Sequence, residues 1–200
     1  MSETPLCALA RKYGTDKGGR HIKYPSGRCH NYTPTYYDMW KARRLESLTI
    51  LEIGVQDGRS IQMWRDFFPH AQIYGWDIDT QQYAYPEDQY IKIMRVPLGR
   101  FHDWVVTEAD EAPIRAALDA EGSPIFDFII DDGSHCDAQQ QLAVDVLLPY
   151  LHINGIFCIE DHDTLQPPDT FVDVPSGFSR EILLNRDPHP DSLLQVIRHV

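Results

Sequence analysis

Short apolar runs recur along the chain, and most of them end in glycine or acidic residues. Such runs occupy residues 48–53, 71–77, 90–96, 125–130 and 155–159. Segments with helical spacing of apolar residues lie between them, at 60–68, 101–120 and 137–148. Apolar strands that alternate with helices are typical of a mostly parallel sheet with helices on both faces. The pattern therefore predicts an α/β fold.

Further elements are predicted toward the two ends of the chain. Thr33-Pro34 is a typical helix start and predicts a helix to about Arg44, whose aromatic side chains serve in packing. Residues 182–184 and 193–197 flank a polar segment and predict an antiparallel pair of strands that closes the sheet. The predicted helix at 101–120 is expected to be interrupted near Pro113.

Two loops are candidates for contact with a ligand. Residues 11–32 are rich in glycine, charge and aromatic side chains and lack the pattern of a core element. They indicate either an extension of the chain or a lid that carries Tyr13, Asp16 and Lys17 to a ligand. The proline-containing segment 164–178 is a candidate wall of a pocket.

Composition narrows the class of protein. The 200 residues, 42% hydrophobic and 24% charged, indicate a single globular domain over 1–200, with a lid and helix in 1–47 and an α/β core in 48–200. A net charge of −12 argues against nucleic acid as a partner. No signal-peptide pattern or run of ~18 apolar residues is present, so we expect a cytoplasmic protein with no membrane partner. The four cysteines lack the C-x-x-C spacing of a zinc ribbon.

Functional groups cluster where two predicted strands end. One strand is followed by Asp131, Asp132, Gly133, Ser134 and His135, and another ends in Glu160 and Asp161. If the two strands are neighbours, their carboxylates converge at the edge of the sheet where α/β proteins bind ligands. Crowded carboxylates need a positive charge between them, and a divalent cation is the usual one. His162 and Asp163 are interpreted as structural.

A glycine turn follows the first strand. Glu52, Gly54 and Gly58 form the pattern E-x-G-x-x-x-G before a predicted helix, which is the arrangement of a mononucleotide-binding unit. Asp77 ends the next strand, 77 − 58 = 19 residues after Gly58. An acidic residue at that place commonly binds ribose hydroxyls, so we expect this role for Asp77.

These motifs together resemble a known family. Residues 51–60, with Asp77, resemble the S-adenosylmethionine (SAM) site of class I methyltransferases. The segments 13–18, 30–33, 130–135 and 159–161 resemble the metal-dependent sugar O-methyltransferases of macrolide biosynthesis. The resemblance implies a Rossmann-like fold, with a seven-stranded, mostly parallel sheet, helices on both faces and a C-terminal antiparallel hairpin.

The resemblance also implies roles for individual residues. The metal ligands would be Asp132, Glu160 and Asp161, which would hold Mg²⁺, and His135 would be the general base. The SAM site would be formed by Tyr13, Thr15, Lys17, Glu52, Gly54, Asp57, Gly58, Ser60, Asp77 and Asp131. The implied reaction is transfer of the SAM methyl group to a hydroxyl of a small molecule, such as a sugar or another diol of a glycosylated natural product. Assembly into a homo-oligomer is left open.

Two other functions are compatible with parts of the sequence. Asp77-Ile-Asp-Thr80 mimics the nucleophile motif of haloacid-dehalogenase-type phosphatases, and the acids at 131–132 mimic their magnesium motif. That interpretation leaves the glycine turn and Glu160-Asp161 unexplained, so we rank it below methyl transfer. A SAM-binding subunit without catalysis is the third interpretation, and the intact metal and base positions argue against it.

Overall fold

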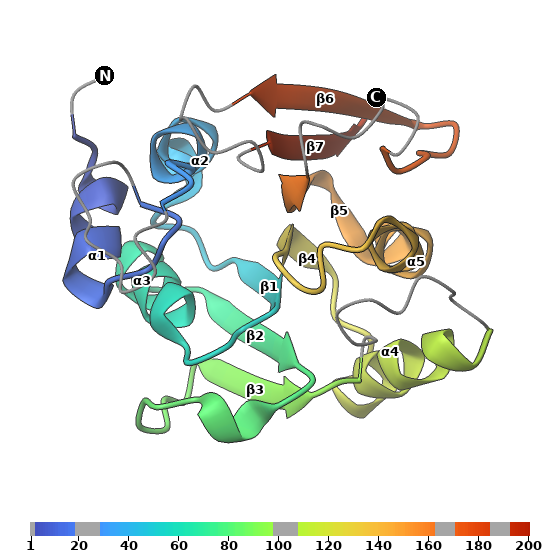
Figure 1. Ribbon diagram of the computed structural model, residues 1–200, viewed down its shortest axis with the longest axis horizontal. Helices are drawn as coiled ribbons and strands as arrows, with labels where there is room; N and C mark the ends of the chain where they lie inside the picture. Colours follow the sequence, from blue (N-terminus) through green and yellow to red (C-terminus); the bar gives the residue numbers. More distant parts are fainter. Residues whose placement is uncertain (1–2, 19–28, 98–107, 163–170, 185–192) are drawn as a thin grey trace.

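A seven-stranded mixed sheet forms the centre of the molecule (Figure 1). The computed structural model describes residues 3–18, 29–97, 108–162, 171–184 and 193–200. The strands follow the order β3-β2-β1-β4-β5-β7-β6. Their bounds are Thr49–Ile53 (β1), Gln72–Asp77 (β2), Ile91–Arg95 (β3), Phe126–Asp131 (β4), Leu151–His162 (β5), Phe178–Leu184 (β6) and Leu193–His199 (β7). The first five strands are parallel, and β7 pairs antiparallel with both β5 and β6. This arrangement confirms the predicted fold class.

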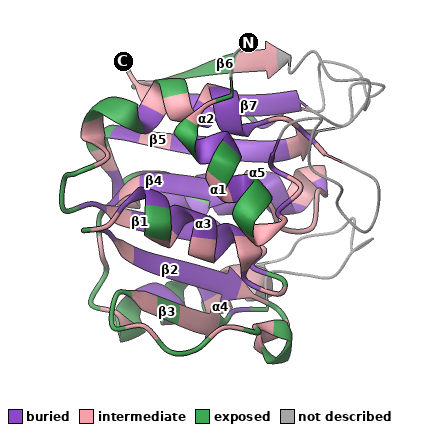
Figure 2. Cartoon of the chain, turned by 90° about the vertical axis from the view of Figure 1, so that its left-hand side faces the viewer, coloured by how far each residue is buried: buried purple, intermediate pink, exposed green. Residues whose placement is uncertain are grey.

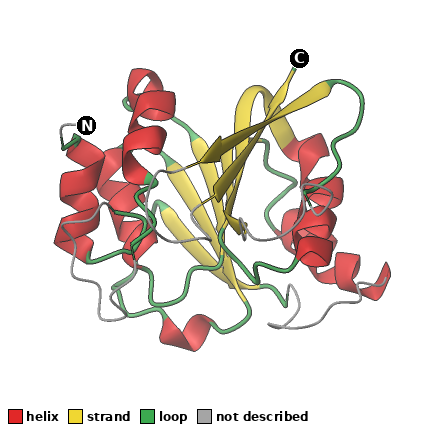
Figure 3. Cartoon of the chain, turned by 45° about the horizontal axis from the view of Figure 1, so that its top comes forward, coloured by secondary structure: helices red, strands yellow, loops and turns green. Residues whose placement is uncertain are grey.

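Helices cover both faces of the sheet, as Figures 1 and 3 show. On one face lie α1 (Pro5–Tyr13), α2 (Thr33–Trp40) and α3 (Arg59–Phe67), and on the other α4 (Glu108–Ala120) and α5 (Asp137–Leu147). Short 3₁₀ turns occupy Lys41–Arg43, Thr80–Gln82 and Leu148–Tyr150. None of the helices in the described ranges is long and apolar enough to cross a membrane.

Each face of the sheet has its own apolar core. Under α2 and α3, Trp40 stacks on Phe128 of β4 and on Tyr36, with ring centroids 4.7 and 4.4 Å apart. Under α4 and α5, a second cluster includes Ile114 and Leu142. Figure 2 shows the central strands β2 and β4 almost wholly buried and the edge strands β3 and β6 partly exposed. Burial on both faces explains why the central strands are continuous apolar runs.

Two elements differ from the sequence-based expectation. Helix α1 was not predicted, although Thr4 caps it by accepting a hydrogen bond from the backbone N–H of Cys7, and Leu6 and Ala10 are fully buried. The predicted interruption of the helix near Pro113 is wrong, because α4 continues through that residue. A proline in the second turn removes only one backbone hydrogen bond, which the packed face of α4 tolerates. The first part of that predicted helix, 101–107, lies outside the described residues.

Candidate active site

Three neighbouring strands end at the same edge of the sheet. In the register, Asp131 of β4 lies opposite Ile53 of β1 and Ile159 of β5. The next residue along each strand, Gly54, Asp132 or Glu160, therefore lies at this edge. The chain continues from β1 to β2 on one side and from β4 to β5 on the other, so the strand order reverses here. Ligand sites of open α/β sheets lie at such a reversal.

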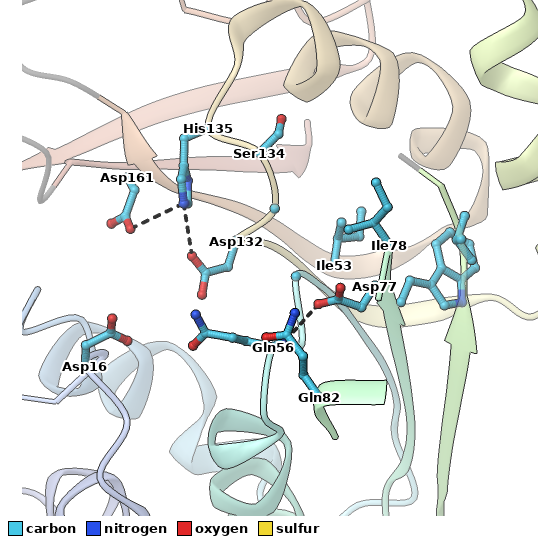
Figure 4. Close-up of a pocket in the computed structure, with 14 residues that line it drawn as sticks. Asp16, Ile53, Gln56, Asp77, Ile78, Gln82, Asp132, Ser134, His135 and Asp161 are labelled. Carbon is cyan, nitrogen blue, oxygen red and sulfur yellow. Dashed lines mark hydrogen bonds and ion pairs between the residues drawn. The ribbon is translucent and has the colours of Figure 1, made fainter. Parts of the chain in front are cut away.

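A pocket of about 470 Å³ opens at this edge. It is lined by the ends of β1 and β2, by the loop after β4, and by Asp16 and Asp161. Figure 4 shows Asp132, His135 and Asp161 close together on one side of the pocket, with Asp77 and Gln56 elsewhere on its wall. The pocket thus joins the predicted SAM side and the predicted metal side.

Among the described residues, Asp132, His135 and Asp161 form a cluster of potential metal ligands. One ligand atom from each side chain lies within 4.8 Å of the others. His135 Nε2 is 4.0 Å from Asp132 Oδ1 and 3.9 Å from Asp161 Oδ2. His135 and Asp161 both have positive φ angles, of 57° and 56°. Such backbone is costly for non-glycine residues and persists where the surroundings fix it, often at functional sites.

Asp161 is held by two aromatic residues of the N-terminal part. The Tyr32 hydroxyl donates to Asp161 Oδ1 at 2.7 Å, and His30 Nδ1 lies 3.0 Å from the same oxygen. The two rings stack, with centroids 5.6 Å apart. Burial alone would raise the pKa of Asp161, but the hydrogen bonds from His30 and Tyr32 and the charges of His30 and His135 together outweigh burial, so this pKa lies below its ordinary value. The carboxylate is therefore kept charged and oriented.

Lys17 lies inside the acidic centre. Its ammonium donates to Asp132 Oδ2 and to Glu160 Oε2, the latter at 2.7 Å, and lies 3.4 Å from Glu52 Oε1. Burial would lower the pKa of Lys17, but the carboxylates of Asp132 and Glu160 raise it well above its ordinary value. The side chain is therefore a permanent cation with 1% exposure.

Glu160 accepts hydrogen bonds on both of its carboxylate oxygens. Its Oε1 accepts a short hydrogen bond from the Tyr36 hydroxyl, and its Oε2 accepts from Lys17. Burial raises the pKa of Glu160 well above its ordinary value, although the Lys17 ammonium opposes this. Sequence reasoning assigned Tyr36 to packing alone. It does pack in the core, but its hydroxyl also reaches a predicted metal ligand.

The glycine turn after β1 lies against the end of β4. A Cβ on Gly54, whose φ is 84°, would overlap the backbone carbonyl of Asp132. Asp77 holds this turn, because its Oδ2 accepts from Gln56 N at 2.7 Å and its Oδ1 from Asp79 N at 2.8 Å. The carboxylate of Asp77 also lines the pocket, so it can accept hydroxyl donors from a ligand.

Only some of the remaining residues of the predicted SAM site line a cavity. A smaller adjoining hollow is lined by Thr15, Asp57, Ser60 and Gly54, among others. Glu52 is fully buried beneath it, accepts from the Ser60 hydroxyl at 2.9 Å, and has its pKa raised by burial to about 7. Gly58 is the N-cap of α3, with a φ of 90°. Asp131 is buried, and its carboxylate accepts a hydrogen bond from Gly133 N. The Tyr13 hydroxyl donates to Asp66, and Tyr13 lines neither hollow.

Sequence reasoning missed His30 and Tyr32 as site residues. Both belong to segment 30–33, which resembles the sugar O-methyltransferases. That resemblance was the only sign in the sequence that these two residues could belong to the site. Of the residues predicted to lie on a lid, Asp16 lines the pocket and the ammonium of Lys17 reaches the carboxylates. His162 pairs through its backbone with Leu193 at the start of β7. Asp163 and residues 164–170 of the predicted pocket wall lie outside the described residues.

The chain has sequence relatives among O-methyltransferases, although no family model matches it. It is 33% identical over 167 residues to the 8-demethyl-8-alpha-L-rhamnosyl tetracenomycin-C 2'-O-methyltransferase of Streptomyces olivaceus. It is 30% identical over 162 residues to the demethylmacrocin O-methyltransferase of Streptomyces fradiae. The two alignments cover 80% and 78% of this chain and 38% of each relative. The chain thus spans well under half the length of these relatives.

Solved structures show the same fold. The MycE methyltransferase from the mycinamycin biosynthetic pathway, in complex with Mg, SAH and mycinamycin VI, matches with a TM-score of 0.68 and 22% identity. That match covers 98% of this chain and 55% of MycE. Human methyltransferase-like protein 13 in complex with SAH matches with a TM-score of 0.58 and 15% identity, over 80% of this chain and 75% of that one.

Proposed function

We propose that this chain, which has the class I methyltransferase fold and sequence relatives among sugar O-methyltransferases, transfers the methyl group of SAM to a hydroxyl of a small molecule. One observation carries the proposal. A single pocket has Asp77 and the glycine turn on its wall together with the cluster of Asp132, His135 and Asp161. A methyl donor and an activated hydroxyl can therefore meet in one cavity.

The residues around the glycine turn fit SAM. SAM supplies an electrophilic methyl group on a sulfonium. Asp77, fixed by the backbone N–H groups of Gln56 and Asp79, offers its carboxylate to the ribose hydroxyls. Gly54 lies too close to the carbonyl of Asp132 to carry a side chain, so the turn presents only backbone to the pocket at this residue. Thr15, Asp57 and Ser60 line the adjoining hollow and are proposed to hold the remainder of the cofactor together with Glu52, Gly58 and Asp131.

The acidic cluster fits a divalent cation. Oxygen ligands that face one another across a few ångström suit Mg²⁺, and Asp132 and Asp161 provide them on the pocket side. When bound, the ion lowers the pKa of an acceptor hydroxyl and fixes its direction. The participation of Glu160, implied by the family resemblance, stays a prediction.

His135 is placed to accept the proton of the acceptor hydroxyl. It lines the pocket, and its Nε2 lies between the carboxylates of Asp132 and Asp161. Both carboxylates stabilise the imidazolium that forms when His135 takes the proton. General-base catalysis of this kind contributes typically about 10² to 10⁴-fold. His135 is thus the proposed catalytic residue, and Asp132 and Asp161 orient it.

The proposed acceptor is a sugar of a glycosylated natural product, by analogy with the printed activities of the relatives. The segment 11–32 is proposed to act as the lid, since Asp16 and Lys17 reach the site from the turn after α1. A cytoplasmic location and self-association stay predictions.

The phosphatase interpretation finds no support in the geometry. Both oxygens of Asp77 accept from backbone N–H groups, and Asp79 accepts from the backbone N–H of Gln81 at 3.1 Å. These carboxylates thus stabilise the turn after β2.

The direct test is to incubate the purified chain with SAM, Mg²⁺ and a panel of rhamnosides, other glycosides and catechols. Mass spectrometry should detect a product heavier by one methyl group. Release of phosphate from phosphate esters, with no SAM binding, would favour the phosphatase instead. SAM binding with no methylated product for any acceptor would favour the non-catalytic subunit.

A further inference from the structure

Asp16 lies where the two hollows of the site meet. It lines both the main pocket and the adjoining hollow, and among the described residues it shares this position with Gly54, Gln56 and Asp132. Figure 4 shows the carboxylate of Asp16 directed toward the pocket, on the side opposite Asp77. A ligand that extends from one hollow into the other therefore has to pass Asp16.

The carboxylate of Asp16 differs from the other carboxylates of the site, because the described part of the chain offers it no hydrogen-bond or ion-pair partner. Asp132 contacts the ammonium of Lys17, and Asp57 pairs with Arg59 at 2.8 Å. The other pocket carboxylates accept hydrogen bonds from backbone or side-chain donors. Asp16 is half-buried, and a charge in such a place is unfavourable without a partner. A positively charged group of a ligand would supply the missing partner.

The sulfonium of SAM is the positive group that fits this position. Its sulfur is bonded to three parts of the cofactor, which the proposed site holds in three places. The ribose lies against Asp77, the amino-acid part enters the adjoining hollow, and the methyl group points toward the acceptor hydroxyl beside His135. The sulfur joins these three parts, so it has to lie where the two hollows meet, beside Asp16.

We propose that Asp16 recognises the positive charge of the sulfonium and thereby distinguishes SAM from the product, SAH. The inference rests on the proposed methyl transfer. In that reaction the acceptor oxygen forms a bond to the methyl carbon, the carbon–sulfur bond breaks, and its electron pair stays on sulfur. The proton of the hydroxyl goes to His135. The sulfur of SAH is therefore neutral, and its attraction to Asp16 is lost in the product.

This charge recognition has a kinetic consequence. The positive charge on sulfur decreases toward the transition state, so Asp16 binds SAM more strongly than it binds the transition state. An interaction that is stronger in the ground state lowers KM without raising kcat. Removal of the Asp16 charge should therefore raise the KM for SAM and leave kcat undiminished.

The test is calorimetric titration of SAM, SAH and sinefungin into the wild type and into Asp16→Asn, and it needs no acceptor. Sinefungin carries a protonated amine in place of the methylated sulfonium, so it keeps the positive charge. Asp16→Asn should weaken the binding of SAM and sinefungin by about five- to tenfold, as for a partly exposed ion pair, and change SAH binding by less than about twofold.

Two further variants serve as controls. Asp16→Glu keeps the charge and should retain most of the preference for SAM over SAH. Asp77→Asn should weaken the binding of SAM and SAH equally, because both ligands contain the ribose. Circular dichroism establishes that each variant is folded. The melting temperature of Asp16→Asn should equal that of the wild type, because the substituted carboxylate has no partner in the described chain.

Equal losses of SAM and SAH affinity in Asp16→Asn, or no loss of either, would overturn the inference and leave the proposed methyl transfer intact. A lower melting temperature with an unchanged preference for SAM would make Asp16 a structural residue and would also overturn it. Failure of the wild type to bind SAM or SAH at all would overturn both the inference and the proposed function. The two kinds of failure are therefore distinguishable.

Discussion

Replacement of Gly54 by alanine tests the contact that joins the two halves of the site. Gly54 has a φ of 84°, and an added Cβ would overlap the carbonyl of Asp132. Gly122 is a matched control, with a φ of 74° and open space around the added Cβ. Both substitutions introduce a left-handed non-glycine residue, at a cost of about 1–2 kcal/mol. Only Gly54→Ala also forces the glycine turn away from β4.

The difference in stability between the two variants measures how closely Gly54 approaches the carbonyl of Asp132. Overpacking adds about 1–3 kcal/mol, so Gly54→Ala should lose about 2–5 kcal/mol and Gly122→Ala about 1–2 kcal/mol. For a chain of this length each kcal/mol shifts the melting temperature by about 2–4 °C. Thermal unfolding followed by circular dichroism should therefore show the larger fall for Gly54→Ala, and calorimetry should show weaker SAH binding for that variant alone. Equal falls in melting temperature would refute the close contact between the turn and β4.

Two further predictions concern the proposed ligand-binding and catalytic residues. Asp77→Ala should weaken SAH binding by about tenfold or more, since a hydrogen bond to a charged group contributes about 1.5–3 kcal/mol, whereas Asp79→Ala should have little effect. Calorimetry on folded variants decides this, and equal affinities would remove Asp77 from the site. His135→Ala should lower kcat by about 10² to 10⁴-fold and leave SAH and Mn²⁺ binding measurable. A structural His135 would instead lower the melting temperature and leave the turnover of the folded enzyme near normal.

Local sequence patterns predicted the sheet well. The strands β1, β2 and β4 are apolar runs that end at a turn or an acid, so their bounds were readable to within a residue. The acidic end of β5 was readable too, but β5 begins at Leu151, before the predicted start at residue 155. Parallel order then placed Asp132 beside Glu160 and Asp161, because the ends of neighbouring parallel strands share an edge. Helix α1 was missed although Thr4-Pro5 repeats the start signal of Thr33-Pro34. Its short apolar face, with Leu6 and Ala10, becomes informative only once α3 is there to pack against.

The arrangement around the carboxylates could not be predicted in the same way. Lys17 is 115 residues from Asp132 and 143 from Glu160 along the chain, and lysine is usually exposed. The periodicity of α2 placed Tyr36 in the core but could not show that its hydroxyl reaches Glu160. Contacts of this kind depend on how the N-terminal part packs on the sheet, which no local pattern records.

The most direct test of the account is methyl transfer from isotopically labelled SAM to an accepted glycoside, measured with and without excess chelator. If methyl transfer depends on a metal ion held by Asp132, chelation abolishes the labelled product and added Mg²⁺ restores it in the wild type. The Asp132→Ala variant is then inactive under both conditions, although it is folded and binds SAH. Undiminished turnover of the wild type in excess chelator would contradict the metal-dependent mechanism.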